Sequence, residues 1–362
     1  MLRAISPSLT DDAVGTMVEA DNAKARSALD LNSRAAMNRL FGIFLFLAVS
    51  VAASRRASAP VELWAFTGPW DARSDSSLRA NAPHLDVAVT GWIGLDSSTA
   101  QPIIPSPYPD TMRLGNSRIK RMAIVTSWHG DRFHPSSIRT LGRDDTRLAR
   151  AAGAIAGHAA ALHYSGLVLD FESLERADRH SLLHVIKAIA DSAHARHVAT
   201  VVVAIPAVDT VVYPAKPLVA VADLVMPMLY DQHWSTSAPG AISEPDWVRS
   251  ALAGRIAEVG ASRIVAALPL YGYRWSLKTK AAAQDVTFTD AKRSAAQAGV
   301  QLTRDSKTNT LRGAKPGDWE IWVTDSELLS NLVRQTKDAG VDRIALWRIG
   351  QEDPAIWRAI AR

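Results

Sequence analysis

From residue 61 onward, short apolar runs alternate with longer stretches in which apolar residues recur every three or four positions. Uninterrupted apolar runs of this length are typical of strands buried on both faces, and the longer period is typical of helices that bury one side. The strand candidates begin at residues 61, 85, 121, 166, 199, 222, 263 and 343. The clearest helical segments between them are 146–163, 178–196, 244–259 and 326–339.

Strands that alternate with helices predict parallel pairing, and eight such units predict a closed (β/α)8 barrel, here spanning residues 60–362. A doubly wound open sheet is the alternative architecture, but no glycine-rich phosphate loop follows the first strand. The interval between the seventh and eighth strands is much longer than the others, and its pattern indicates a strand, a helix and further short strands. We therefore expect a small α+β insertion at about residues 276–325.

A separate apolar run, residues 40–53, precedes the barrel. It is uncharged, follows Arg39 and leads into small residues. Its 14 residues are short for a membrane-spanning helix, which needs about 20, and they match the apolar core of a signal peptide. We therefore expect residues 1–59 to be an export segment, which places the protein in the periplasm or outside the cell.

The polar stretch before this run is longer than the start of an ordinary signal peptide, since 36 residues precede Met37. We hypothesise that translation starts at Met37, because a chain that begins there has a compact signal peptide. An uncleaved membrane anchor through residues 40–53, with residues 1–36 in the cytoplasm, is the alternative.

The composition of the chain excludes several classes of function. The chain has 362 residues, of which 48% are hydrophobic, which is enough for a large core. The formal net charge of +5 is too small and too scattered to indicate a nucleic-acid partner. Cysteine is absent, which excludes disulfides, thiolate metal sites and a cysteine nucleophile.

The fourth strand candidate, "GLVLDFES", ends in two carboxylates. Successive strand residues alternate between faces, so Val168, Asp170 and Glu172 share one side. In a barrel this side is the interior, and it reaches the C-terminal mouth where active sites lie. Two shielded carboxylates roughly 6.5 to 7 Å apart raise each other's proton affinity, so one can stay protonated as a general acid. The alternative is that Asp170 caps the next helix and Glu172 is a surface residue.

Four segments, each at the end of a different strand candidate, resemble glycoside hydrolase family 18 in order and spacing. They are "GLVLDFESL", "MPMLYDQHW", "ALPLYGYRW" and "ALWRIGQEDPAIW". The resemblance is greatest to the bacterial branch that contains spore-cortex and cell-wall N-acetylglucosaminidases and the hydrolase domains fused to polysaccharide deacetylases, and it runs from about Val61 to the C-terminus. It implies a barrel that cleaves β-linked N-acetylglucosamine polymers with retention, with the substrate's own acetamido group as nucleophile. We expect neither a metal nor another cofactor.

The resemblance also implies roles for individual residues. Glu172 matches the acid that protonates the glycosidic oxygen and later activates water. Asp170 matches the carboxylate that orients the acetamido N–H and stabilises the oxazolinium intermediate. Tyr230 matches the hydroxyl that holds the acetamido oxygen, Asp231 matches a residue that binds the same sugar, and Trp347 matches the hydrophobic floor under the reacting ring.

Further substrate-binding candidates follow from position. Tyr271 and Trp275 belong to the segments that carry the resemblance. Trp70 follows the first strand candidate and Trp128 the third, where each forms either a sugar subsite or ordinary packing at the rim. We expect Met228 to point into the mouth, where it either lines a sugar site or packs against its neighbours.

One departure from the family pattern D-x-x-D-x-D-x-E stands out, because its first two aspartate positions are Ser165 and Val168 here. Loss of the inner aspartate removes a partner that could share a proton with Asp170. The leading hypothesis is an exported, retaining β-N-acetylglucosaminidase that acts on peptidoglycan, chitin or poly-N-acetylglucosamine. A non-catalytic, lectin-like barrel of the cell envelope that binds carbohydrate is the alternative.

Overall fold

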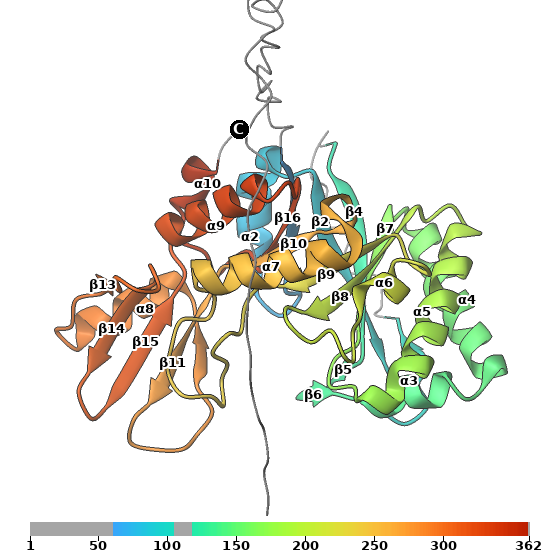
Figure 1. Cartoon of the computed structure of the whole chain (residues 1–362), viewed down its shortest axis with the longest axis horizontal. Helices are drawn as coiled ribbons and strands as arrows, with labels where there is room; N and C mark the ends of the chain where they lie inside the picture. The colour runs from blue at the N-terminus through green and yellow to red at the C-terminus, as the bar shows by residue number, and fades with distance from the viewer. Residues whose placement is uncertain (1–60, 105–117, 361–362) are drawn as a thin grey trace, which may run out of the picture. The chain divides into compact units, whose positions relative to one another are not determined.

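The computed structural model describes residues 61–104 and 118–360, and its largest sheet is a closed barrel (Figure 1). Eight parallel strands pair in the order β1-β16-β10-β9-β8-β7-β4-β2, and β2 closes the ring by pairing with β1. The predicted (β/α)8 barrel is therefore confirmed. The strands are β1 (Glu62–Phe66), β2 (Val87–Leu95), β4 (Lys120–Thr126), β7 (Gly166–Asp170), β8 (Thr200–Pro206), β9 (Leu224–Met228), β10 (Ala266–Pro269) and β16 (Arg343–Trp347).

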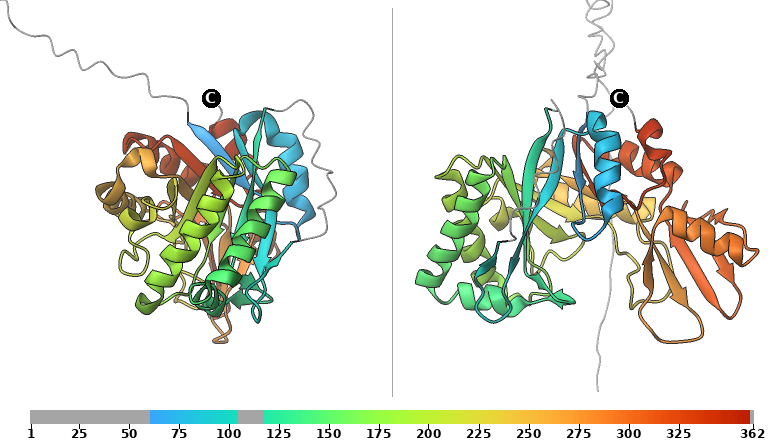
Figure 2. Two further views of the ribbon diagram at one scale, coloured as in Figure 1. Left: turned by 90° about the vertical axis from the view of Figure 1, so that its right-hand side faces the viewer. Right: turned by 180° about the vertical axis from the view of Figure 1, so that it is seen from behind.

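Helices cover the outside of the ring, and Figure 2 shows α4 and α5 side by side against the sheet. Side chains cap several helix starts, as where Asp144 accepts a hydrogen bond from the Arg147 amide at 2.9 Å. The α-helices outside the segment between β10 and β16, together with α9 within it, are α2 (Ala72–Asn81), α3 (Pro135–Leu141), α4 (Asp145–Ala161), α5 (Arg179–His194), α6 (Ala215–Leu218), α7 (Pro245–Val259), α9 (Ser326–Asp338) and α10 (Ile356–Ala359). Short 3-10 turns are η1 (Ala82–His84), η2 (Arg176–Asp178) and η3 (Ala261–Arg263).

The barrel strands are apolar on both faces because each face packs against a different core. On β1, Leu63 and Ala65 belong to the large core beneath the helices, whereas Trp64 and Phe66 fill the interior of the barrel. Strand β7 alternates in the same way, with Val168 in the interior. The alternation inferred from the sequence therefore holds, and it directs the residue after Val168 on the same face toward the barrel mouth.

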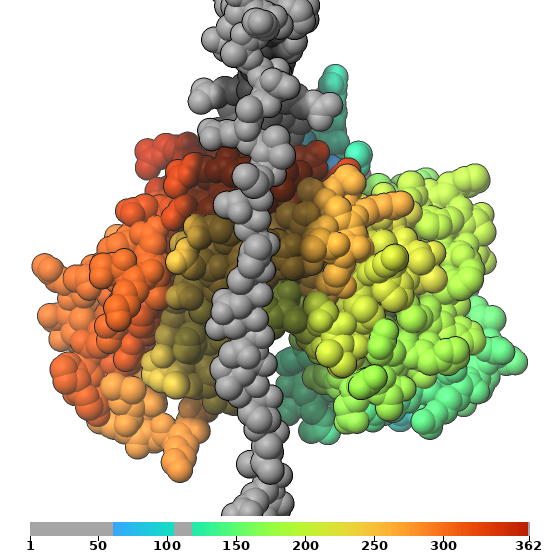
Figure 3. Space-filling view, in the orientation of Figure 1, coloured from blue at the N-terminus to red at the C-terminus, as the bar shows by residue number. Residues whose placement is uncertain are grey.

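Between β10 and β16 the chain forms a second, antiparallel sheet in the order β12-β11-β15-β14-β13, with one helix against it. Figure 3 shows this insertion in orange on one side of the barrel, with helices α3 to α5 in shades of green on the other. Gly272 starts β11, where a Cβ atom would lie 2.2 Å from the Trp322 carbonyl oxygen. The elements are β11 (Gly272–Ser276), β12 (Gln284–Val286), α8 (Phe288–Gln297), β13 (Thr303–Arg304), β14 (Leu311–Lys315) and β15 (Trp319–Val323).

Small strands border the mouth of the barrel. Strand β3 (Pro102–Ile103) pairs antiparallel with the end of β2, and β5 (Trp128–His129) forms a hairpin with β6 (Arg132–Phe133). The expected export segment, residues 1–59 with the apolar run 40–53 and the proposed start at Met37, lies outside the described residues and stays a prediction. Within the described ranges, no helix is both long enough and apolar enough to cross a membrane.

Candidate active site

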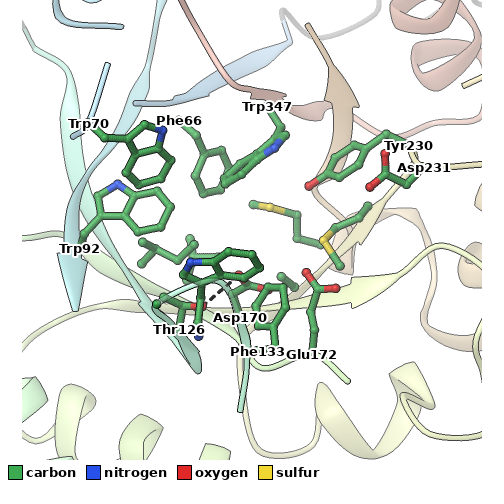
Figure 4. A pocket seen from close by; sticks show the side chains of 17 residues that line it. Phe66, Trp70, Trp92, Thr126, Phe133, Asp170, Glu172, Tyr230, Asp231 and Trp347 are labelled. Carbon is green, nitrogen blue, oxygen red and sulfur yellow. Dashed lines mark hydrogen bonds between the residues drawn. The ribbon is translucent and has the colours of Figure 1, made fainter. Parts of the chain in front are cut away.

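A cavity of about 560 Å³ opens at the C-terminal ends of the barrel strands (Figure 4). Its walls come from strands that are far apart in sequence, because a closed parallel barrel brings all its carboxyl ends to one rim. Most of the side chains predicted for the site line this cavity, namely Trp70, Asp170, Glu172, Met228, Tyr230, Asp231 and Trp347.

Asp170 is the last residue of β7 and is only 8% exposed. Its Oδ2 accepts a hydrogen bond from Thr126 Oγ1 at 3.3 Å, while its Oδ1 is buried without a hydrogen-bond partner among the described residues. Burial raises the pKa of Asp170 to about 6, and the Thr126 hydroxyl opposes this rise. Beneath it, Val168 is fully buried, so no second carboxyl group lies there to share a proton.

Glu172 follows two residues later and also faces the cavity (Figure 4). Burial raises the pKa of Glu172 well above its ordinary value, and the nearby carboxylates of Asp170 and Asp231 raise it further. The pKa of Glu172 is thus held well above its ordinary value, beside an Asp170 whose pKa is about 6. A carboxyl group with raised proton affinity and a second carboxyl group face the same cavity, an arrangement that suits general acid catalysis beside a developing positive charge.

Tyr230 and Asp231 reach the cavity from the end of β9 (Figure 4). Burial raises the pKa of the Tyr230 hydroxyl well above its ordinary value, and the carboxylates of Glu172 and Asp170 add to this, so the group remains a hydrogen-bond donor. Burial also raises the pKa of Asp231, an effect that the hydroxyls of Tyr271 and Tyr273 oppose.

Tyr271 and Trp275 are not among the residues that line the cavity, so their contact with substrate stays a prediction. The Tyr271 hydroxyl donates to Asp231 Oδ1, so this tyrosine supports a cavity residue from behind. Trp275 is 4% exposed, and its indole N–H donates to the Ser237 carbonyl at 3.0 Å. Both residues lie at or next to β11, whose pairing with β15 places them in a core of their own with Trp322.

Aromatic side chains form the wall of the cavity that lies across from Glu172 (Figure 4). The Trp347 ring lies 5.3 Å from Phe66 and 6.2 Å from Trp92, and Trp92 lies 4.8 Å from Trp70. Flat, apolar ring faces of this kind suit the apolar faces of pyranose rings. Trp70 and Trp128 are 64% and 45% exposed, so both offer ring surface at the mouth.

Sequence reasoning missed Trp92, Phe66 and Thr126. The strand ends "VELWAFT" and "RMAIVT" contain the signal for Phe66 and Thr126, because both residues close a strand on its inward face. Trp92 gave no such signal. A register shift between Val89 and Gly91 interrupts β2, so simple alternation from Val89 assigns Trp92 to the wrong face.

Arg348 supports the aromatic wall from behind. Its Nη1 donates to Asp71 Oδ2 at 2.8 Å, and its guanidinium lies 5.5 Å from the centre of the Trp70 ring. Burial alone would raise the pKa of Asp71, but hydrogen bonds from Arg73 and Arg348 lower it to about 2. This buried ion pair fixes the loop that carries Trp70.

The described part of the chain contains no group of three or more histidine, aspartate or glutamate side chains that could hold a metal ion. The described lining of the cavity has carboxyl groups at Asp170, Glu172 and Asp231 and no lysine, arginine or histidine. What the arrangement offers is therefore a proton donor, an anion, a phenol and an indole floor.

No protein-family model matches the chain. Among curated proteins, the uncharacterized glycosylase YvbX of Bacillus subtilis is 24% identical over 214 residues, which cover 55% of this chain and 61% of that protein. The cortical fragment-lytic enzyme of the same organism is 23% identical over 254 residues, which cover 65% of this chain and 58% of that protein. The chain thus spans about three fifths of the length of these relatives.

Solved structures share the fold. The Bacillus cereus spore cortex-lytic enzyme SleL gives a TM-score of 0.72 at 20% identity, covering 83% of this chain and 74% of that chain. A chitinase from Chromobacterium violaceum gives 0.73 at 21% identity, with 83% and 98% covered. A GH18 chitinase from Cycas revoluta, solved with (GlcNAc)3, gives 0.67 at 19% identity, with 82% and 98% covered. In its motifs and in its fold, the chain therefore resembles glycoside hydrolase family 18.

Proposed function

We propose that the chain is a glycoside hydrolase that cleaves polysaccharides containing N-acetylglucosamine, with retention of configuration. The observation that supports this most is the meeting of Glu172, whose pKa burial raises, buried Asp170, the Tyr230 hydroxyl and the Trp347 indole in one cavity. The names of the relatives, a glycosylase and a cortical fragment-lytic enzyme, and those of the chitinases with the same fold agree with this proposal.

In the proposed reaction, Glu172 donates its proton to the glycosidic oxygen as the bond from that oxygen to C1 breaks. The carbonyl oxygen of the sugar's own acetamido group attacks C1 and forms a cationic oxazolinium ring. Asp170 accepts the acetamido N–H and stabilises the positive charge, while Tyr230 holds the acetamido oxygen toward C1. Glu172, now ionised, takes a proton from a water molecule that opens the ring from the face that the leaving group left.

The alternative is a barrel that binds the same sugars without cleaving them. Val168 keeps this alternative open, because the proton-sharing partner expected below Asp170 is absent. Two observations favour the enzyme. The acid position is a glutamate that faces the cavity, and its raised pKa favours the protonated form that bond cleavage needs.

The cavity also favours some sugars over others. With three carboxyl groups and no basic side chain in its described lining, it opposes a substrate that carries a free carboxylate close to the cleaved bond. We therefore propose uncharged N-acetylglucosamine runs, as in chitin or poly-N-acetylglucosamine, ahead of peptidoglycan strands with free carboxylates.

The proposal predicts which product anomer forms first. Incubation with chitin oligomers, poly-N-acetylglucosamine and peptidoglycan, followed by proton NMR within the first minutes, should show the β-anomer at the new reducing end before mutarotation. An initial α-anomer would contradict the retaining mechanism. Oligosaccharide binding without cleavage between about pH 4 and pH 8 would favour the lectin-like alternative instead.

Removal of the hydroxyl that contacts Asp170 should shift the pH dependence. In Thr126→Val the hydrogen bond that lowers the pKa of Asp170 is lost, so this pKa rises and the acidic limb of kcat/KM moves to higher pH. Activity below about pH 6 should fall roughly tenfold, and the loss should shrink toward pH 8. Thr126→Ser keeps the hydroxyl and serves as the matched control. An acidic limb at the same pH in both variants would exclude this role for Thr126.

We further propose that the protein acts outside the cytoplasm. The apolar run 40–53 and the small residues after it support this. An uncut anchor through the same run would also place the barrel outside, but at the membrane surface. N-terminal sequencing of the mature protein distinguishes the two.

A further inference from the structure

A single tyrosine hydroxyl brackets the backbone on both sides of Glu172. The Tyr213 hydroxyl donates to the Phe171 carbonyl at 2.9 Å and accepts from the Leu174 amide at 3.4 Å. Tyr213 is 3% exposed and does not line the cavity. It therefore contacts the main chain that carries Glu172 from the side away from the substrate.

This stretch of chain needs an external support, because the sheet no longer holds it. Pairing of β7 with β4 ends at Asp170, and pairing with β8 ends at Leu169. Glu172 lies beyond both ladders. The next residue, Ser173, has a φ of 59°, a left-handed conformation that non-glycine residues adopt at a cost. The Tyr213 hydroxyl closes this turn where the ladder hydrogen bonds stop.

Tyr213 is itself held by a buried arginine of α7. Arg255 is fully buried, and its guanidinium donates to the Tyr213 carbonyl at 2.9 Å. The same group donates to three further carbonyls at 2.7 to 3.1 Å, those of Pro206 at the end of β8 and of Ala207 and Asp209 after it. Glu258 balances its charge at 2.8 Å. The loop that carries Tyr213 is thus fixed by a rigid, planar donor.

From this continuous set of contacts we propose that Tyr213, fixed by Arg255, is a positioning residue that sets where the Glu172 carboxyl group lies relative to the glycosidic oxygen. The inference rests on the proposed hydrolase function and extends it to residues that do not touch substrate. A general acid must lie within hydrogen-bond reach of its target, so a small shift of the main chain at Glu172 weakens proton donation before it affects binding.

The test compares two leaving groups. Tyr213→Phe removes the hydroxyl and keeps the ring, so the core stays filled. A sugar alcohol leaves only when it is protonated, whereas 4-nitrophenolate leaves without help from an acid. Tyr213→Phe should therefore lower kcat/KM on chitin oligomers at least roughly tenfold, and on the 4-nitrophenyl glycoside of N,N'-diacetylchitobiose less than about twofold. KM for the oligomers should stay unchanged.

The matched control is Tyr164→Phe. Tyr164 is a buried tyrosine just before the opposite end of β7, so its variant also loses one buried hydroxyl but should leave the ratio between the two substrates as in the wild type. A second variant, Arg255→Lys, should change the ratio in the same direction as Tyr213→Phe, even if it is less stable. Because the ratio compares substrates on one preparation, partial unfolding does not alter it.

Equal losses on both substrates would overturn the inference, since they indicate a general structural defect. An unchanged ratio in Tyr213→Phe, together with a changed ratio in Glu172→Gln, would overturn it while leaving the proposed function intact. A wild-type protein that cleaves neither substrate would overturn both. These three outcomes separate the failure of Tyr213 as a positioning residue from the failure of the hydrolase assignment.

Discussion

Replacing Glu172 with glutamine is expected to lower kcat/KM on N-acetylglucosamine oligomers roughly 100- to 10,000-fold, the range that a positioned general acid contributes. Glutamine has nearly the shape of the protonated side chain, but it cannot release a proton to the glycosidic oxygen. The decrease in kcat/KM should be much smaller for a 4-nitrophenyl glycoside, because its leaving group needs no proton when the glycosidic bond breaks. Steady-state kinetics on both substrates measure this difference.

Binding separates this effect from damage to the fold. Titration calorimetry should show that Glu172→Gln still binds the oligomers, since the aromatic wall and Tyr230 are untouched. Glu175→Gln is the matched control, because Glu175 lies three residues further along the chain with a side chain that is 78% exposed. It should turn over like the wild type. Unchanged turnover in Glu172→Gln would rule out the proposed acid and favour the lectin-like alternative.

Replacing Asp170 with asparagine is expected to lower kcat at least roughly 100-fold, because the charge that stabilises the oxazolinium ion is lost. The same change removes a carboxylate that raises the pKa of Glu172. The pKa of Glu172 should therefore fall, and the basic limb of the pH profile should move to lower pH. A rate profile of the residual activity measures this shift.

The Asp170→Asn variant should also be more stable than the wild type at high pH. Burial raises the pKa of Asp170 from 3.8 to about 6, so the folded state favours the protonated form. The stability that this protonation adds is fully present below about pH 4 and is lost as the pH rises through about 6. Above pH 7, the ionised carboxylate therefore costs up to about 3 kcal/mol relative to a neutral side chain of the same shape.

Urea denaturation of Asp170→Asn and the wild type at pH 4 and pH 8 tests this pH dependence of stability. The gain in free energy of unfolding should be present at pH 8 and nearly absent at pH 4. Asp191→Asn serves as the control, because Asp191 is an exposed partner of Lys187 on α5 and surface pairs contribute little. If the variant is destabilised at both pH values, Asp170 stabilises the fold through packing, and its ionised carboxylate does not lower the free energy of unfolding.

The sequence predicted the barrel well because its strands and helices differ in period and length. The predicted helix 244–259 corresponds to α7 (Pro245–Val259), and 326–339 corresponds to α9 (Ser326–Asp338). The position of Asp170 also followed from a local rule, since alternation along β7 directs it into the mouth, and Glu172 faces the same cavity from two residues beyond the strand.

Other parts of the site depend on contacts that no local rule reveals. Trp92 lies beyond a register shift, so counting from Val89 gives the wrong face. Tyr271 and Trp275 share a segment with a barrel strand, but their side chains follow the pairing of the second sheet. Tyr213 lies 42 residues from Phe171 in sequence, and only the folded loop brings them together.

The contact between Tyr271 and Asp231 has a consequence for protein engineering. The insertion looks like a module that could be exchanged between barrels, since it has its own sheet and a small core around Trp319. Yet its first residues provide the hydroxyl that Asp231 needs, and Ala241 and Ile242 are covered by its tryptophans. Replacing this segment as one unit would remove the hydrogen bond to Asp231 and expose Ala241 and Ile242 to solvent. The insertion and the mouth of the barrel therefore have to be redesigned together.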